Sequence, residues 1–282
     1  MHNPRMIALS VLSAAGASPR RRGRRRGGNA PARWRQRAQW LWRHLNAAPR
    51  PLRIAVIGTT VLALLAATNL VYQVARKPTE MFFPVAGALD KMPVATWAEY
   101  GPLFREYSTA AIPPELLAAL AQVEGAGNPL ARTYWRWRLT WNPLAIYRPA
   151  SSAVGMYQMT DAAFAAAREA CIRDHAVVED CWFTGLYSRV LPSHAIELAA
   201  VSLDRQVAAI LAQRPRHARA TPQQRQDLAA LIHLCGAGPA KAFARRGFHL
   251  LPGQRCGDHD AARYLAAVTA MKQQFQRLGA GA

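Results

Sequence analysis

The residue best placed to do chemistry is Glu124, which ends an apolar helical segment. The segment starts at Pro113-Pro114, whose fixed φ and missing N–H suit a first helical turn, and it stops before Gly125-Ala126-Gly127. Low dielectric and the negative end of the helix dipole both disfavour a charged carboxylate there. We therefore expect a protonated side chain able to act as a general acid, or else a glutamate that reaches solvent at a frayed helix end. The apolar residues on the same helical face are Leu117, Leu120 and Ala121.

A second segment places Gly155-Met156-Tyr157-Gln158 in a turn before a helix that Thr160 can cap. In one interpretation this segment contacts a bound substrate. In the alternative interpretation, Met156 fills apolar space and Gln158 satisfies a buried backbone group. The candidate binding residues in this segment are Ser152, Gly155, Met156, Tyr157 and Gln158.

Together the two segments resemble the lytic transglycosylases of the soluble lytic transglycosylase (SLT) type, which have a lysozyme-like helical fold. In that family a helix-end Glu-Ser is followed by Gly-Leu-Met-Gln and later by Ala-Tyr-Asn-x-Gly. Glu124-Gly125 resembles the first motif and Gly155-Met156-Tyr157-Gln158 the second. The segment around Cys235-Gly236 resembles the third, but these two residues replace the family's Tyr and Asn. The resemblance covers residues 111–245.

This resemblance implies cleavage of the β-1,4 bond between N-acetylmuramic acid and N-acetylglucosamine in peptidoglycan, giving 1,6-anhydro products. Glu124 would serve as the one catalytic acid and base, and no metal or other cofactor is needed. The family's Tyr helps to orient the catalytic carboxyl, and His233 and Tyr157 are the candidates to replace it here. His233 and Gly236 also join the expected substrate-binding residues. Two other interpretations are a lysozyme-like hydrolase and a noncatalytic wall-binding scaffold in a secretion or division machine, which the missing Tyr-Asn pair favours.

The beginning of the chain is strongly basic. Residues 1–53 hold thirteen arginines and no acidic residue, out of a net charge of +20 for the whole chain. Such a composition cannot bury enough apolar surface to fold alone, so we expect a disordered segment. A short amphipathic helix on a membrane is also compatible with the pattern, and a basic run can bind nucleic acid. Because an apolar segment follows, we favour the membrane and expect no nucleic-acid partner. The apolar residues of this helix would be Trp34, Trp40, Trp42 and Leu45.

Residues 54–75 carry no formal charge and lie between Arg53 and Arg76-Lys77. At about 1.5 Å per residue, a helix of this length reaches roughly 33 Å, enough for a hydrocarbon core of about 30 Å. The arginines before it predict a cytoplasmic N-terminus and an exported C-terminal part, as in a single-pass protein of a bacterial inner membrane. The alternatives are a buried helix of a soluble domain and, for Met6 to Ala17, a signal-peptide core, which lacks a strong basic lead.

All four cysteines lie after the apolar segment, which favours disulfides in an oxidising periplasm. Of three possible pairings we prefer Cys171 with Cys181 and Cys235 with Cys256, because each closes a short local loop. The competing interpretation is a zinc site. Its ligands would be His233, Cys235, Cys256 and His259.

We therefore expect a mostly α protein with four parts: basic segment 1–53, transmembrane helix 54–75, linker 76–93 and lysozyme-like SLT domain 94–282. Residues 134–141 alternate too strictly for a helix and predict an extended arm or hairpin. This arm would be a sugar-binding wall, or a hairpin that buries its tryptophans, or both. The expected partners are peptidoglycan glycan strands, a membrane and an envelope machine. The other predicted helices are Trp97–Tyr107, Ser193–Arg214, Thr221–Leu234 and Asp260–Leu278.

Overall fold

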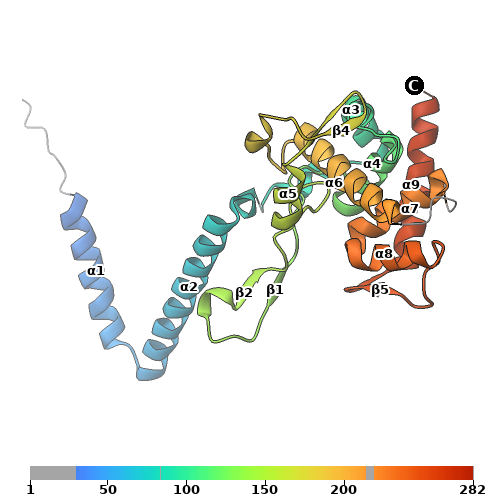
Figure 1. Cartoon of the computed structure of the whole chain (residues 1–282). Helices are drawn as coiled ribbons and strands as arrows, with labels where there is room; N and C mark the ends of the chain where they lie inside the picture. Colours follow the sequence, from blue (N-terminus) through green and yellow to red (C-terminus); the bar gives the residue numbers. More distant parts are fainter. Residues whose placement is uncertain (1–29, 83, 214–218, 282) are drawn as a thin grey trace, which may run out of the picture. The chain divides into compact units, whose positions relative to one another are not determined.

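The structure is a computed structural model that describes residues 30–82, 84–213 and 219–281 (Figure 1). The apolar run from Met6 to Ala17 therefore lies outside the described residues. The described part is mostly helical, as predicted. The chain divides into two compact units, Met1–Val61 and Leu62–Ala282, and the division falls inside one long helix.

Helices α1 (Ala30–Ala47) and α2 (Arg50–Arg76) come first along the chain. Within the basic segment 1–53, α1 corresponds to the amphipathic-helix alternative and exposes Trp40 and Trp42. Helix α2 begins four residues earlier than predicted, because Pro51 fits its first turn. It is long and apolar enough to cross a membrane, and its apolar side chains are mostly exposed.

The segment after α2 corresponds to the predicted linker, residues 76–93. It contains two short 3-10 helices, η1 (Pro78–Phe82) and η2 (Ala86–Leu89). Glu80 of η1 is buried and forms ion pairs with Lys77 at 3.0 Å and Arg132 at 3.1 Å. Buried charges are tolerated only when they are paired, so these contacts fix the end of α2 to the domain that follows.

Six helices build the core of the domain, and α4 lies among them. It packs against α3, α6 and α9, and residues 116–121 of α4 are all buried. The helices predicted from apolar periodicity are confirmed with small shifts at their ends. Thr221 and Gln224 form the predicted capping box at the start of α7. The six helices are α3 (Pro93–Glu106), α4 (Pro114–Gly125), α6 (Pro192–Ala212), α7 (Pro222–Cys235), α8 (Ala237–Arg245) and α9 (Ala261–Ala280).

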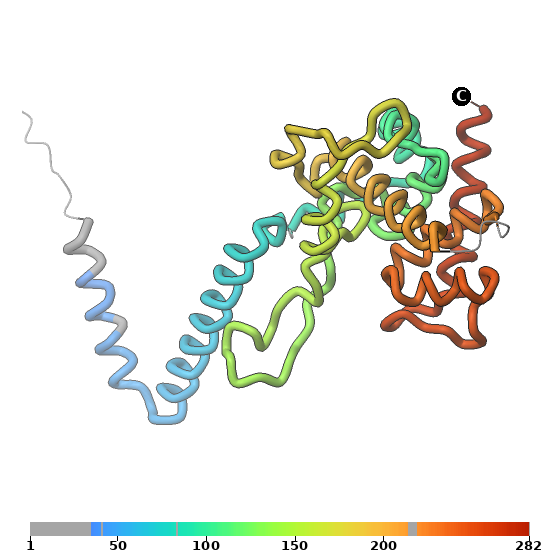
Figure 2. Tube along the Cα trace, in the orientation of Figure 1, coloured from blue at the N-terminus to red at the C-terminus, as the bar shows by residue number. Residues whose placement is uncertain are grey.

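Short antiparallel hairpins fill the connections between helices. The first, β1 (Trp135–Trp137) with β2 (Tyr147–Pro149), confirms the predicted hairpin and places Trp137 opposite Tyr147. Figure 2 shows this hairpin as an arm that leaves the helical domain next to the end of α2. The remaining elements are η3 (Pro143–Ala145), α5 (Asp161–Ala167), β3 (Cys171–Arg173), β4 (Ala176–Val178), η4 (Thr184–Leu186), β5 (Arg255–Cys256) and β6 (His259–Asp260).

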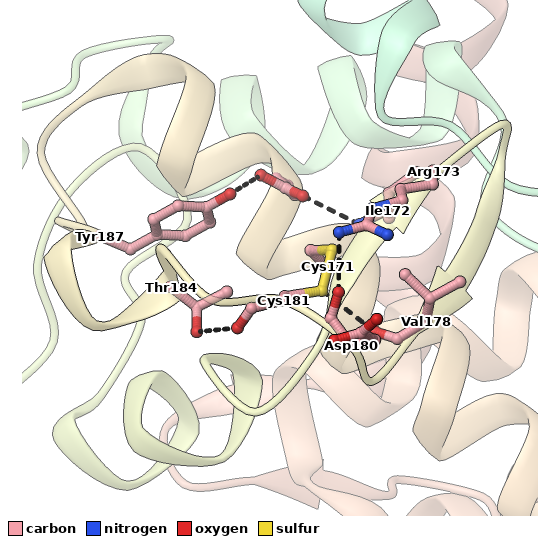
Figure 3. The surroundings of a disulfide bond; sticks show 9 residues. Cys171, Ile172, Arg173, Val178, Asp180, Cys181, Thr184 and Tyr187 are labelled. Carbon is pink, nitrogen blue, oxygen red and sulfur yellow. Dashed lines mark hydrogen bonds between the residues drawn. A yellow bond between two sulfur atoms is a disulfide. The ribbon is translucent and has the colours of Figure 1, made fainter.

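Both predicted disulfides are present. Cys171 is bonded to Cys181, and Cys235 to Cys256. The thiolates that the zinc alternative requires are therefore used in a disulfide. Figure 3 shows the first bond with Ile172 and Tyr187 nearby. The buried carboxylate of Glu197 joins these two residues, because it accepts from the Ile172 N–H at 2.9 Å and from the Tyr187 hydroxyl at 2.7 Å. Glu197 thus has a structural role in this loop.

Candidate active site

Glu124 lies in the last turn of α4, where the sequence predicts it. The helix ends because Ala126 adopts a left-handed conformation with φ 50° and Gly127 follows with φ 63°. The Glu124 side chain is 19% exposed, so its carboxyl group reaches the surface from a helix whose middle, residues 116–121, is buried. A carboxyl in such a position is accessible to a ligand and is still held by the protein around it.

Two side chains approach the Oε1 atom of Glu124. The hydroxyl of Tyr264, on α9, donates a hydrogen bond to Oε1 at 2.5 Å. The Nε2 atom of His233, in the last turn of α7, lies 3.6 Å from the same oxygen. Helix α9 packs against α4 and α7, which is why groups far apart in the sequence meet here.

Tyr264 is buried, and burial raises the pKa of its phenol well above the usual range; the neighbouring Glu124 carboxylate raises it further. The phenol therefore remains protonated at physiological pH and acts as a donor. A hydrogen bond from a phenol to a carboxyl oxygen fixes the orientation of the carboxyl group. This is the orienting role that the sequence analysis assigned to His233 or Tyr157.

That assignment is wrong for Tyr157. Its side chain is buried, and its hydroxyl donates to the Leu117 carbonyl at 3.1 Å, so it holds its loop against α4. His233 does lie beside Glu124, as predicted. Tyr264 was not identified, because it lies in an ordinary amphipathic helix with no local motif around it.

The first two motifs are in direct backbone contact. A Cβ added to Gly125 would lie 2.8 Å from Met156 Cα and 2.9 Å from Met156 O. Gly155 has φ 79°, and a Cβ there would collide with the Arg189 carbonyl. Glycine is therefore required at both positions. The contact fixes the end of α4 against the loop of the second motif.

The side chains of that loop divide into two groups. Met156 and Tyr157 are fully buried, backbone included, so the structure does not place these two predicted binding residues where a substrate can reach them. Gln158 is partly exposed, has φ 44°, and donates from Nε2 to the Gly155 carbonyl at 2.9 Å. The Ser152 hydroxyl accepts from the Asp161 N–H, beside Thr160, which caps α5 as predicted.

The third motif contributes backbone geometry and a crosslink. Gly236 has φ 77° and joins α7 directly to α8, and it is exposed. Cys235 connects the end of α7 to β5 through Cys256. Thus Cys235 and Gly236 carry a disulfide and a turn, while the hydroxyl that contacts Glu124 comes from α9.

A cavity of about 670 Å³ lies near the end of α2, and Glu124 is not among its lining residues. Its cationic lining residues are Arg76, Lys77, Arg148 and Arg189. Arg189 is paired with Asp161 at 2.7 Å, and Lys77 with Glu80. We assign no catalytic role to this cavity.

The arrangement can carry out proton transfer at a single carboxyl group. Across residues 30–281, outside the gaps at 83 and 214–218, no cluster of three or more His, Cys, Asp or Glu side chains is placed to hold a metal ion. Comparisons with protein-family models and with curated proteins find no match for this chain.

Proposed function

We propose that this protein is a membrane-anchored lytic transglycosylase that cleaves peptidoglycan glycan strands with Glu124 as acid and base. The observation that carries the proposal is the hydrogen bond from the buried Tyr264 hydroxyl to Glu124 Oε1. An accessible glutamate at a helix end, oriented by a permanently protonated phenol, has the properties needed for proton transfer to a glycosidic oxygen.

The proposed reaction assigns a separate task to each oxygen of Glu124. Oε1 accepts the Tyr264 hydrogen bond, so Oε2 is the oxygen that holds the transferable proton. Oε2 donates this proton to the oxygen between the muramic C1 and the next sugar as the C1–O bond breaks. The resulting carboxylate then takes the proton of the muramic C6 hydroxyl while that oxygen bonds to C1. The products are a 1,6-anhydro end and a free 4-hydroxyl, and no water is consumed.

Membrane anchoring belongs to the same proposal. Helix α2 would cross a bacterial inner membrane once, with the arginine-rich segment in the cytoplasm and the domain in the periplasm. Two observations support this placement: α2 exposes apolar side chains along its length, and both disulfides lie after it, where an oxidising compartment would form them.

The test is the full-length Glu124→Gln variant in detergent, incubated with purified peptidoglycan. Gln keeps the size of the side chain but cannot transfer the proton, so release of soluble glycan fragments should stop while the melting temperature stays near the wild-type value. Glu115→Gln is the matched control, since Glu115 is a carboxylate at the opposite end of the same helix and should be dispensable. Fragment release by Glu124→Gln at the wild-type rate would contradict the proposal and favour a noncatalytic scaffold.

A further inference from the structure

The β1–β2 hairpin exposes an unusual set of apolar side chains. We call residues 134–147 the hairpin arm. Leu139 and Trp141 at its tip are fully exposed, and Trp137 is 74% exposed and stacked on Tyr147. Exposed contiguous apolar surface of this kind marks a place where a protein meets a partner or a membrane.

Two hydrogen bonds connect the hairpin arm to the apolar helix α2. Asn69 donates from Nδ2 to the Tyr147 carbonyl at 2.7 Å, and Gln73 donates from Nε2 to the Leu144 carbonyl at 2.6 Å. Both amides are buried, whereas Leu70 and Val71 between them are exposed. The arm therefore covers the amides of Asn69 and Gln73 and leaves apolar side chains of the same part of the helix exposed.

The base of the arm is fixed as well. The buried carboxylate of Glu80 accepts from the Trp135 indole N–H at 2.8 Å and pairs with Arg132. Glu80 lies four residues after the end of α2, so helix, arm and domain are joined at this point. The arm is thus held against α2.

The positions of Asn69 and Gln73 along α2 indicate how deep in the bilayer the hairpin arm would meet this helix. Counting 1.5 Å per residue, Gln73 and Asn69 lie about 5 and about 10 Å before Arg76 along the helix axis. The headgroup layer on each side of a bilayer is about 5 to 8 Å thick, from a total of about 40–45 Å around a core of about 30 Å. The arm consequently meets α2 near the boundary between headgroups and hydrocarbon.

We propose that the hairpin arm is a second membrane contact, which inserts Trp137, Leu139 and Trp141 into the outer leaflet beside α2. This inference rests on the proposed crossing of the membrane by α2. Tryptophan and tyrosine rings favour this interfacial depth because they combine an apolar body with a polar N–H or O–H group.

The exposed arginines near the arm are also compatible with a lipid membrane as its partner. Arg136 and Arg138 are exposed and alternate with the apolar residues of β1. Arg76 is exposed at the end of α2, over the ring of Tyr72. Guanidinium groups at this level bind lipid phosphates while the apolar side chains enter the leaflet. The arm would in this way fix the orientation of the domain on the membrane surface.

A bimane fluorophore and nitroxide-labelled lipids test the proposal in the full-length protein reconstituted in vesicles. The fluorophore is attached to Leu139→Cys in the arm, to Leu65→Cys in α2 or to Leu186→Cys, an exposed leucine of η4 that serves as the matched control. The four native cysteines are kept oxidised. The label at position 139 should lose most of its fluorescence to a nitroxide near the headgroups, and less to one deep in the acyl chains. The label at position 186 should lose none.

The label at position 65 separates the two proposals. Strong quenching there by the deep nitroxide, together with an unquenched label at position 139, would overturn the hairpin inference and leave the anchor intact. An unquenched label at position 65 would overturn both. If peptidoglycan fragments, rather than lipid nitroxides, changed the fluorescence at position 139, the arm would be a glycan-binding wall and the membrane inference would be wrong.

Discussion

At the residue scale, the hydroxyl of Tyr264 engages one oxygen of the Glu124 carboxyl and leaves the other free for the transferable proton. Glu124 can donate a proton without the Tyr264 hydroxyl, but the hydroxyl is needed to hold its carboxyl group in one orientation. A carboxyl that rotates freely would present its proton to the glycosidic oxygen for only part of the time. Tyr264 is therefore a positioning residue for the proposed reaction.

We predict that Tyr264→Phe keeps the fold and slows peptidoglycan cleavage. A hydrogen bond to a charged group is worth about 1.5–3 kcal/mol, so its loss should reduce kcat about ten- to a hundredfold. KM should change little, because the hydroxyl touches the carboxyl and not the glycan. The measurement is initial-rate release of soluble fragments at several peptidoglycan concentrations.

Tyr187→Phe is the matched control for that variant. It removes the same atom from a hydrogen bond to a different glutamate, Glu197. We expect a lower melting temperature and an unchanged kcat at temperatures where the protein is folded. Equal rates for Tyr264→Phe and wild type, with a slower Tyr187→Phe, would contradict the assignment.

The environment of Tyr264 also predicts an alkaline effect on stability. Burial, and then the Glu124 carboxylate, raise the pKa of Tyr264 above its ordinary value of about 10. Below about pH 10 the phenol is protonated in both the folded and the unfolded chain, so its contribution to stability is fully present. Above that pH the unfolded chain loses this proton while the folded chain retains it, so the free energy of unfolding falls as pH rises.

Melting temperatures measured from about pH 9 to about pH 11 should therefore fall more steeply for wild type than for Tyr264→Phe, which has no phenol to ionise at this position. The difference between the two slopes reports the ionisation of Tyr264 alone, because other buried tyrosines, such as Tyr100, are present in both proteins. Parallel slopes for the two proteins would show that Tyr264 is not in this environment.

At the element scale, the contact between the end of α4 and the Gly155-Met156 loop decides whether Glu124 is in place. We predict that Gly125→Ala destabilises the fold by about 1–3 kcal/mol, the usual cost of overpacking, because the new Cβ would meet Met156 backbone atoms that cannot rotate away. Activity should fall as well, since α4 and the loop must separate. The measurements are denaturant unfolding and fragment release.

Gly238→Ala is the control for Gly125→Ala. A Cβ at Gly238 would meet nothing within 4 Å, and the residue lies in α8, where alanine is favoured over glycine by up to about 1 kcal/mol. Its stability should be unchanged or slightly higher. If Gly238→Ala lost as much stability as Gly125→Ala, close packing against Met156 would not explain the effect of Gly125→Ala.

The Cys235–Cys256 bond connects the end of α7, next to His233, to β5. By the chain-entropy model, closing a loop of about twenty residues stabilises the fold by roughly 3 kcal/mol. Cys235→Ser should therefore lower the melting temperature of the oxidised protein and weaken activity, and a chelator should change neither property of the wild type. Free thiols together with chelator-sensitive melting would contradict the disulfide and restore the zinc alternative.

Elements were more predictable from the sequence than the contacts between them. The ends of α4 follow from Pro113-Pro114 and Gly125, and the alternation after Tyr134 predicts the hairpin, because these signals are local. The Tyr264–Glu124 bond joins residues 140 positions apart and depends on how α9 packs against α4. The buried ion pairs of Glu80, which fix a segment predicted to be a linker, depend on tertiary contacts in the same way.

At the scale of the whole molecule, the chain joins an apolar helix to a helical domain through a connection held by the buried Glu80 carboxylate. Glu80 links the end of α2 to the base of the hairpin arm, so anchoring by α2 would restrict how far the domain moves from the membrane. An enzyme held in this way would act on glycan strands close to the inner membrane. Its products then report directly on the proposed chemistry.

The most direct test of the central claim is mass spectrometry of the muropeptides released from purified peptidoglycan by the full-length protein. The proposed mechanism predicts 1,6-anhydro ends, lighter by one water than reducing ends, and no such products from Glu124→Gln. Reducing ends from the wild type would mean that water is the acceptor, as in a lysozyme-like hydrolase. Anhydro products from Glu124→Gln in wild-type amounts would contradict the account.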